Sequence, residues 1–168
     1  SAFALSGYLL TRGGDPYRLA AAGATLGVIA FVLVIFAATV DSTLVFRIGT
    51  GLIGFGTGLL GVGTLTAAMA LAESGHAGLA LGAWGAVQAT SQGVAIALGG
   101  AIRDFTTGLA IDGSLGSDLT AASTGYRIVY VLEVVLLVAA LLALLPMVLR
   151  SRKEDPQPPA QFGLDQMP

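Results

Sequence analysis

Residues 73–104 read ESGHAGLALGAWGAVQATSQGVAIALGGAIRD, and this stretch decides the fold class. No charged residue occurs from Gly78 to Ile102, and a helix of that length crosses a hydrocarbon core of about 30 Å at about 1.5 Å per residue. Small and polar residues fill many positions where a lipid-facing helix carries leucine or phenylalanine. The stretch therefore predicts a small, polar transmembrane helix over residues 77–102, buried among other helices.

The overall composition is that of an integral membrane protein. Hydrophobic residues make up 55% of the 168 residues and charged residues 11%, against roughly 25% charged residues in soluble domains. The 24 glycines suit an all-α bundle in which helix backbones approach closely. The net charge of −2 argues against nucleic acid as a partner, and the lack of cysteine excludes thiolate metal sites and cysteine catalysis.

Three further apolar runs are long enough to span a membrane, and polar segments separate them. The expected spans are residues 19–40, 44–72 (rich in glycine) and 126–149. Residues 1–10 are apolar but too short to cross, so they are expected to be the end of a transmembrane helix. The remaining segments are expected to be a cytoplasmic loop at 11–18, a periplasmic loop at 103–125 and a disordered cytoplasmic tail at 150–168.

The basic residues suggest this orientation. With four alternating spans, five basic residues fall on the side of the C-terminus and three on the other side. The first group is Arg12, Arg18, Arg150, Arg152 and Lys153, and the second is Arg47, Arg103 and Arg127. Because basic residues concentrate in cytoplasmic loops, the C-terminus is expected in the cytoplasm.

Glycines are concentrated in the expected 44–72 span. Seven of them lie between residues 49 and 63, including the GxxxG pair Gly54 and Gly58. Glycine costs about 1 kcal/mol relative to alanine in a soluble helix, so their number indicates close approach by another group. Tight packing of another helix is the preferred interpretation, and contact with a flat ligand is the alternative.

On the 77–102 helix, small residues form one stripe and polar residues flank it. The stripe, by helical projection, consists of Gly78, Gly82, Gly85, Ala89, Gly93 and Gly100. Trp84, Gln88 and Gln92 follow one another at i, i+4 and i+8 along its edge. The stripe is expected to pack against another helix, for which the 44–72 span is the natural neighbour. The glutamines either hydrogen-bond another helix or belong to a binding site, because an unsatisfied amide in lipid is costly.

Two ionisable residues are further candidates. His76 lies in the polar turn before the 77–102 helix, where it is either a solvated or capping residue or a ligand. Glu133 is the only acidic residue in the 126–149 span and makes an intramembrane functional site a hypothesis. The alternative is that Glu133 lies shallow enough to reach the headgroup layer. No arrangement of nucleophile, base and orienting group is evident, so an enzyme is not expected.

The run GTGLLGVGTLTAAMALAESGHAGLALGAWGAVQATSQGVAIALGGAIRD, residues 56–104, resembles the PucC/LhaA bacteriochlorophyll-delivery family of the major facilitator superfamily. The segments LALGAWGAVQAT and GVAIALGGAIRD are its most specific parts. The resemblance covers about residues 1–150 and implies a twelve-helix fold, of which this chain supplies the end of helix 8 and helices 9–12. The missing helices favour a piece of a longer protein over a truncated homologue.

The resemblance implies a role in assembling light-harvesting antenna complexes in the inner or intracytoplasmic photosynthetic membrane. Bacteriochlorophyll would be the bound cargo, and the partners would be antenna polypeptides or the photosynthetic core complex, membrane lipid and the missing N-terminal half. His76, Gln88 or Gln92 would ligate the pigment magnesium, with no other metal site expected, and Trp84 would stack on the ring or donate its indole N–H. A solute or pigment transporter and a structural subunit of a photosynthetic complex remain alternatives.

Overall fold

In the computed structural model, which describes residues 2–72, 76–114 and 124–151, every regular element is an α-helix. The five helices are α1 (Ala2–Thr11), α2 (Pro16–Thr39), α3 (Thr43–Ala70), α4 (Ala77–Ile111) and α5 (Thr124–Ser151). Within these described ranges, α2 to α5 are the four helices long and apolar enough to cross a membrane. Residues 115–123 of the expected periplasmic loop and most of the expected tail, residues 152–168, lie outside the described ranges.

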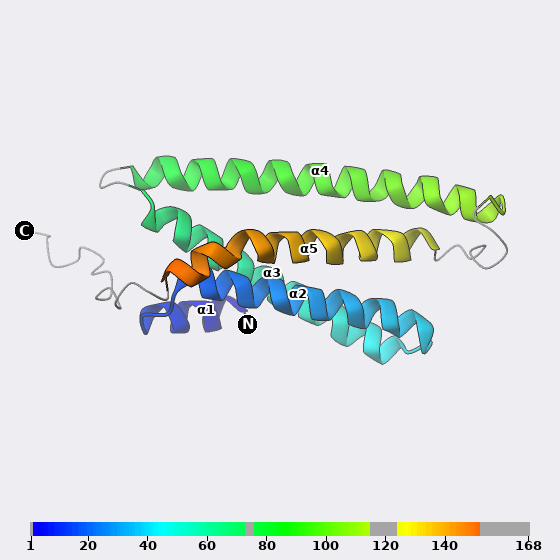
Figure 1. Cartoon of the computed structure of the whole chain (residues 1–168), viewed down its shortest axis with the longest axis horizontal. Helices are drawn as coiled ribbons and strands as arrows, with labels where there is room; N and C mark the ends of the chain where they lie inside the picture. Colours follow the sequence, from blue (N-terminus) through cyan, green and yellow to red (C-terminus); the bar gives the residue numbers. More distant parts are fainter. Residues whose placement is uncertain (1, 73–75, 115–123, 152–168) are drawn as a thin grey trace, which may run out of the picture.

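The helices are arranged around α2 and α5 (Figure 1). α2 packs most extensively on α3 and next on α5, and α1 lies against α3. α4 runs antiparallel to α5, on the side away from α2, and meets only a short part of α3 (Figure 1). The buried cluster of Ala2, Leu19 and Leu59 therefore lies where α1, α2 and α3 meet.

The turn between α1 and α2 is shorter than expected. Asp15 caps α2, its Oδ1 accepting from the Tyr17 backbone N–H at 2.8 Å, and Pro16 fits the first helical position because that position needs no N–H donor. The expected loop at 11–18 is therefore wrong at Thr11, which ends α1, and in its last three residues, which begin α2. Asp15 Oδ2 also accepts a short hydrogen bond from Ser151 at the end of α5, so both helix ends lie on one face of the bundle.

Close contact between backbones holds α2 against α3. A Cβ atom added at Gly23 would lie 2.5 Å from the Leu60 backbone nitrogen. One added at Gly63 would lie 2.6 Å from the Ala20 backbone nitrogen and 2.8 Å from the Pro16 carbonyl oxygen. Glycine is therefore required at these positions, as expected for membrane helices that associate through small residues.

α4 ends nine residues later than the expected 77–102 span. The sequence indicated an exit from the membrane at Arg103 and Asp104, but a charge pair does not break a helix. The helix ends instead at Ile111, two residues before Gly113, whose φ of 71° is in the left-handed region. Hydrogen bonds from Gly113 N to Ala110 O (3.1 Å) and from Ser114 N to Leu109 O (3.0 Å) complete a Schellman cap. At 35 residues, α4 is about 52 Å long, longer than a hydrocarbon core of about 30 Å.

α5 extends two residues beyond the expected 126–149 span at each end. Its first turn lies directly on α4, because a Cβ atom at Gly125 would contact the Thr107 hydroxyl and lie 2.6 Å from the Arg103 carbonyl oxygen. Further along, a Cβ atom at Gly99 would lie 3.8 Å from a Val129 methyl group. These contacts define the antiparallel register, in which residues 103 and 125 lie at nearly the same depth.

Candidate functional site

The candidate site identified from the sequence lies on α4, and its environment differs from the expected one. Ala110 is the only buried residue of α4, a helix that the structure describes throughout. Within the described residues, this helix is therefore not buried among others. The physical reason is its position, since α4 has α5 on one side and touches α3 only near their connecting turn (Figure 1).

The predicted small-residue seam does not form within this chain. No described atom lies within 4 Å of a Cβ position built at any of four α4 glycines, namely Gly78, Gly82, Gly85 and Gly93. On α3, Gly54 is likewise open, whereas a Cβ atom added at Gly58 would lie 2.7 Å from the Ala2 side chain. The expected packing of α4 on the glycines of α3 is therefore wrong, because other α3 glycines are already occupied by α2.

Trp84 is the candidate whose contact the structure defines. Its indole Nε1 donates to Thr64 Oγ1 of α3 at 3.3 Å, and Thr64 in turn donates to the Leu60 carbonyl at 2.8 Å. Trp84 also lines a shallow hollow of about 440 Å³ between the end of α3 and the start of α4, together with Ala68, Leu71, Ala72, Ala80, Ala83 and Val87. The contact with Thr64 was not anticipated from the sequence, since helical projection does not identify a partner on another helix.

Gln88 and Gln92 are both exposed, one turn apart on α4. His76 is exposed as well and precedes the first turn of α4, where its carbonyl accepts from Leu79 N at 3.0 Å while its side chain makes no capping hydrogen bond. The two glutamines of the polar line formed by Trp84, Gln88 and Gln92 are therefore accessible on α4. His76 lies two turns before Trp84, at the end of α4 that borders on α3.

Glu133 lies on α5 and is half-buried. Because Gly99 faces Val129 in an antiparallel pair, Glu133 is level with about residue 95 of α4, which is within about one turn of Gln92. The structure thus brings Glu133 to the depth of the polar line. It does not bring His76 to that depth, since His76 precedes the first turn of α4.

At the opposite end of the bundle, aromatic and charged side chains link α2, α4 and α5. Ring centroids are 5.9 Å apart for Phe31 and Tyr130 and 6.4 Å apart for Tyr126 and Tyr130. The Arg103 guanidinium carbon lies 5.4 Å from the centre of the Tyr126 ring, and Arg103 pairs with Asp104 at 2.6 Å. The pairing of Arg103 with Tyr126 joins α4 to the first turn of α5.

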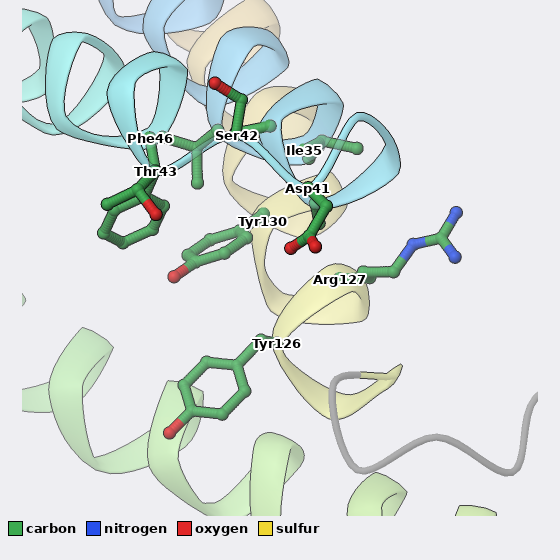
Figure 2. Close-up of a pocket in the computed structure, with 11 residues that line it drawn as sticks. Ile35, Asp41, Ser42, Thr43, Phe46, Tyr126, Arg127 and Tyr130 are labelled. Atoms are coloured by element: carbon green, nitrogen blue, oxygen red, sulfur yellow. The ribbon is translucent and has the colours of Figure 1, made fainter.

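A cavity of about 410 Å³ lies beside Tyr126 and Tyr130, at the turn between α2 and α3 (Figure 2). Its lining residues come from α2, α3, α5 and the connecting turn, and are Val34, Ile35, Ala37, Ala38, Asp41, Ser42, Thr43, Phe46, Tyr126, Arg127 and Tyr130. The Asp41 carboxylate is directed toward Tyr130, whereas the Arg127 guanidinium extends outward from the rim (Figure 2).

A protein-held metal site is not formed by the described residues, among which no three His, Cys, Asp or Glu side chains are close enough to hold an ion. The open α4 face nevertheless fits a flat apolar group that brings its own metal. Its glycines leave space above the backbone, and the amides of Gln88 and Gln92 are exposed beside them as oxygen donors.

Comparison with known proteins identifies the family. The family described as PUCC protein matches residues 2–152, nearly the whole chain. The chain belongs to the PucC family. With four helices able to cross a membrane, this PucC-family chain is part of an all-α, multi-pass membrane protein. No solved structure matches it.

The chain is similar to PucC proteins and one further protein from several bacteria. PucC of Cereibacter sphaeroides is 42% identical over 151 residues, which cover 89% of this chain and 31% of that protein. PucC of Rhodovulum sulfidophilum is 54% identical over 102 residues, covering 61% and 22%. A protein of the puhA–bchM intergenic region of Rhodobacter capsulatus is 41% identical over 170 residues, covering 99% and 35%. The chain thus spans about a third or less of the length of these relatives.

Proposed function

We propose that this chain is the C-terminal part of an assembly factor for light-harvesting antenna complexes, which binds bacteriochlorophyll and delivers it to antenna polypeptides. Membership of the PucC family is the observation that carries the proposal. The proposed partners are antenna polypeptides or the photosynthetic core complex. The proposed location is the bacterial inner membrane, including its intracytoplasmic photosynthetic extensions.

The exposed face of α4 is the proposed pigment surface. A bacteriochlorophyll ring needs a flat apolar surface, a ligand for its magnesium and polar partners for its carbonyl groups. The open glycines supply the surface, and Gln88 or Gln92 would offer an amide oxygen to the magnesium, which prefers oxygen donors. Trp84 is half-buried beside them, with its N–H engaged by Thr64, which holds the indole in place. His76 would serve as the ligand only of a pigment bound nearer the α3 end.

The rest of the proposed protein follows from the resemblance to the major facilitator superfamily. A twelve-helix bundle would place further helices against the exposed face of α4, so that the polar line of Trp84, Gln88 and Gln92 borders a central cavity. The face that holds Asp15 and Ser151 would be cytoplasmic, because Arg12, Arg18 and Arg150 gather there. The protein would act by binding and release, without catalysing a reaction.

Pigment content is the test of this proposal. The purified protein is expected to carry bacteriochlorophyll, seen in its absorbance spectrum, and to release it to antenna peptides in a detergent mixture. Replacing both glutamines, Gln88→Leu and Gln92→Leu, is expected to lower pigment content by about tenfold, which corresponds to about 1.4 kcal/mol for a lost ligand.

Thr90→Val is the matched control, since Thr90 is exposed on the same helix about 200° around its axis from Gln88. A protein that carries no pigment and releases none to antenna peptides overturns the delivery role. Transport of a defined solute into liposomes, with no pigment bound, would instead identify a carrier.

A further inference from the structure

The cavity between α2, α3 and α5 has a lining divided by polarity. Val34 and Ala37 of α2 are buried at 3% and 4% exposure and give it an apolar base. Asp41, Ser42, Thr43 and Arg127 are the polar residues of its lining, beside Tyr126 and Tyr130. Tyr126 is 48% exposed, so the cavity opens to its surroundings. A ligand of this cavity therefore needs both an apolar portion and a polar headgroup.

The position of the cavity is at the boundary between membrane and water. It lies where α2 ends, α3 begins and α5 has its first turns, and these are the ends of three helices able to cross a membrane. Tyrosine is enriched at such interfaces, where its ring is in apolar surroundings and its hydroxyl group is hydrated. The available ligands at that depth are amphipathic molecules of the bilayer.

The charges at the cavity are of opposite sign and are not paired with each other. Among the described residues, the only ion pair joins Arg103 to Asp104, which leaves the carboxylate of Asp41 and the guanidinium of Arg127 open to a ligand. Asp41 points toward the Tyr130 ring and Arg127 lies at the outer rim, while the Tyr126 ring extends toward α4 (Figure 2). A carboxylate among aromatic rings suits an ammonium group, and arginine suits a phosphate.

From this arrangement we infer that the cavity is a binding site for one zwitterionic phospholipid. Its ammonium group lies between Asp41 and the aromatic rings, its phosphate lies at Arg127, and one acyl chain follows the apolar surface of α2. The inference does not depend on pigment binding, because the cavity is on α2, α3 and α5 and the proposed pigment surface is on α4.

Lipid retention by the purified, delipidated protein tests the inference. The protein in dodecyl maltoside is titrated with phosphatidylethanolamine or phosphatidylglycerol of identical acyl chains, and bound lipid is counted by native mass spectrometry. One phosphatidylethanolamine is expected to bind up to about fivefold more tightly than phosphatidylglycerol, the largest difference expected from one exposed ion pair. Glycerophosphoethanolamine, which lacks acyl chains, is expected not to compete.

Variants assign each half of the headgroup. Asp41→Asn is expected to abolish the preference for phosphatidylethanolamine, and asparagine tolerates the positive φ of 48° at this position, so the turn is kept. Arg127→Gln is expected to weaken the binding of both lipids by a similar factor, because both lipids carry a phosphate. Arg47→Gln and Asp112→Asn are controls, since both residues are exposed and neither lines the cavity.

Three results would overturn the inference. Equal retention of the two lipids by the unmodified protein would remove the role of Asp41, as would an unchanged preference in Asp41→Asn. Competition by glycerophosphoethanolamine as strong as that of the intact lipid would indicate a soluble zwitterion rather than a lipid. None of these results bears on pigment content, so the failure of this site is distinguishable from the failure of the proposed function.

Discussion

The glycines of α3 and those of α4 have similar spacing and different surroundings. Gly56 and Gly63 of α3 touch the backbone of α2, whereas Gly82 and Gly85 of α4 have no described atom close to their Cβ positions. α2 and α3 are joined by the short turn Val40–Ser42, which forces them to lie antiparallel and adjacent. A stripe of small residues therefore indicates that another backbone or a flat group approaches the helix there. Chain connectivity decides which of these stripes another helix of this chain covers.

Substitution at Gly63 is expected to have the largest effect on stability. In Gly63→Ala, the added methyl group would overlap the backbone of α2 at Ala20, so the two helices must separate. We expect a loss of about 3 kcal/mol in the free energy of unfolding, the upper end of the range for overpacking. Gly61→Ala is the control on the same helix, because nothing lies within 4 Å of its Cβ position. Equal losses in the two variants, measured by denaturation in mixed detergent micelles, would contradict the close α2–α3 contact.

A smaller loss is expected at the contact between α4 and α5. In Gly125→Ala, the added methyl group meets a movable Thr107 hydroxyl and the fixed carbonyl of Arg103, so the first turn of α5 must shift. We expect about 1–2 kcal/mol of destabilisation and a larger separation of the two helix ends, measured between spin labels at positions 105 and 128. Gly108→Ala, at an open position of α4, should change neither quantity. An unchanged separation in Gly125→Ala would show that α4 is not held by this contact.

The hydrogen bond between Trp84 and Thr64 is expected to contribute about 0.6 kcal/mol, the average for such bonds between membrane helices. A double-mutant cycle of Trp84→Phe with Thr64→Val measures this coupling from unfolding free energies. The same cycle with Thr66→Val should give none, because the indole N–H donates to Thr64 and not to Thr66, although both threonines donate to carbonyl groups of α3. Equal coupling in both cycles would mean that the indole N–H has no specific partner on α3.

The smallest effect on stability is expected on the open face of α4. Gly82→Ala and Gly85→Ala should leave the free energy of unfolding unchanged, or raise it by up to about 1 kcal/mol through better helix propensity. If this face binds pigment or further helices, as proposed, the same variants should lower pigment content and antenna assembly, measured by absorbance. Destabilisation as large as that of Gly63→Ala would show that α4 packs as α3 does, and would remove the contrast between the two helices.

The helices themselves were largely predictable, and their ends were less so. Apolar length alone placed the start of the span at residue 44, one residue after the start of α3 at Thr43. The end of α4 was misplaced, because hydropathy detects the edge of the membrane at Arg103 and cannot detect helix that continues into water. The Schellman cap at Gly113 was the local signal that would have placed it.

The candidate residues were predictable as a pattern on one helix, and their contacts were not. The spacing of Trp84, Gln88 and Gln92 places them on one face through the 3.6-residue period alone. Which of them finds a partner depends on the angle between α3 and α4, and this angle brings Thr64 to Trp84 while leaving both glutamines exposed. The cavity at Asp41 could not be anticipated, because its residues come from two segments, 34–46 and 126–130, that are far apart in the sequence.

The sequence by itself determined that this chain crosses a membrane as α-helices and that small residues line two of them. Both properties follow from transfer free energies and helical periodicity, which act on neighbouring residues. Only the tertiary structure decided that α2 occupies the glycines of α3, that α4 keeps an open face and that Asp41 and Arg127 meet at one cavity. These outcomes depend on helix crossing angles and on the short turns between helices, so they arise from contacts between residues distant in the chain.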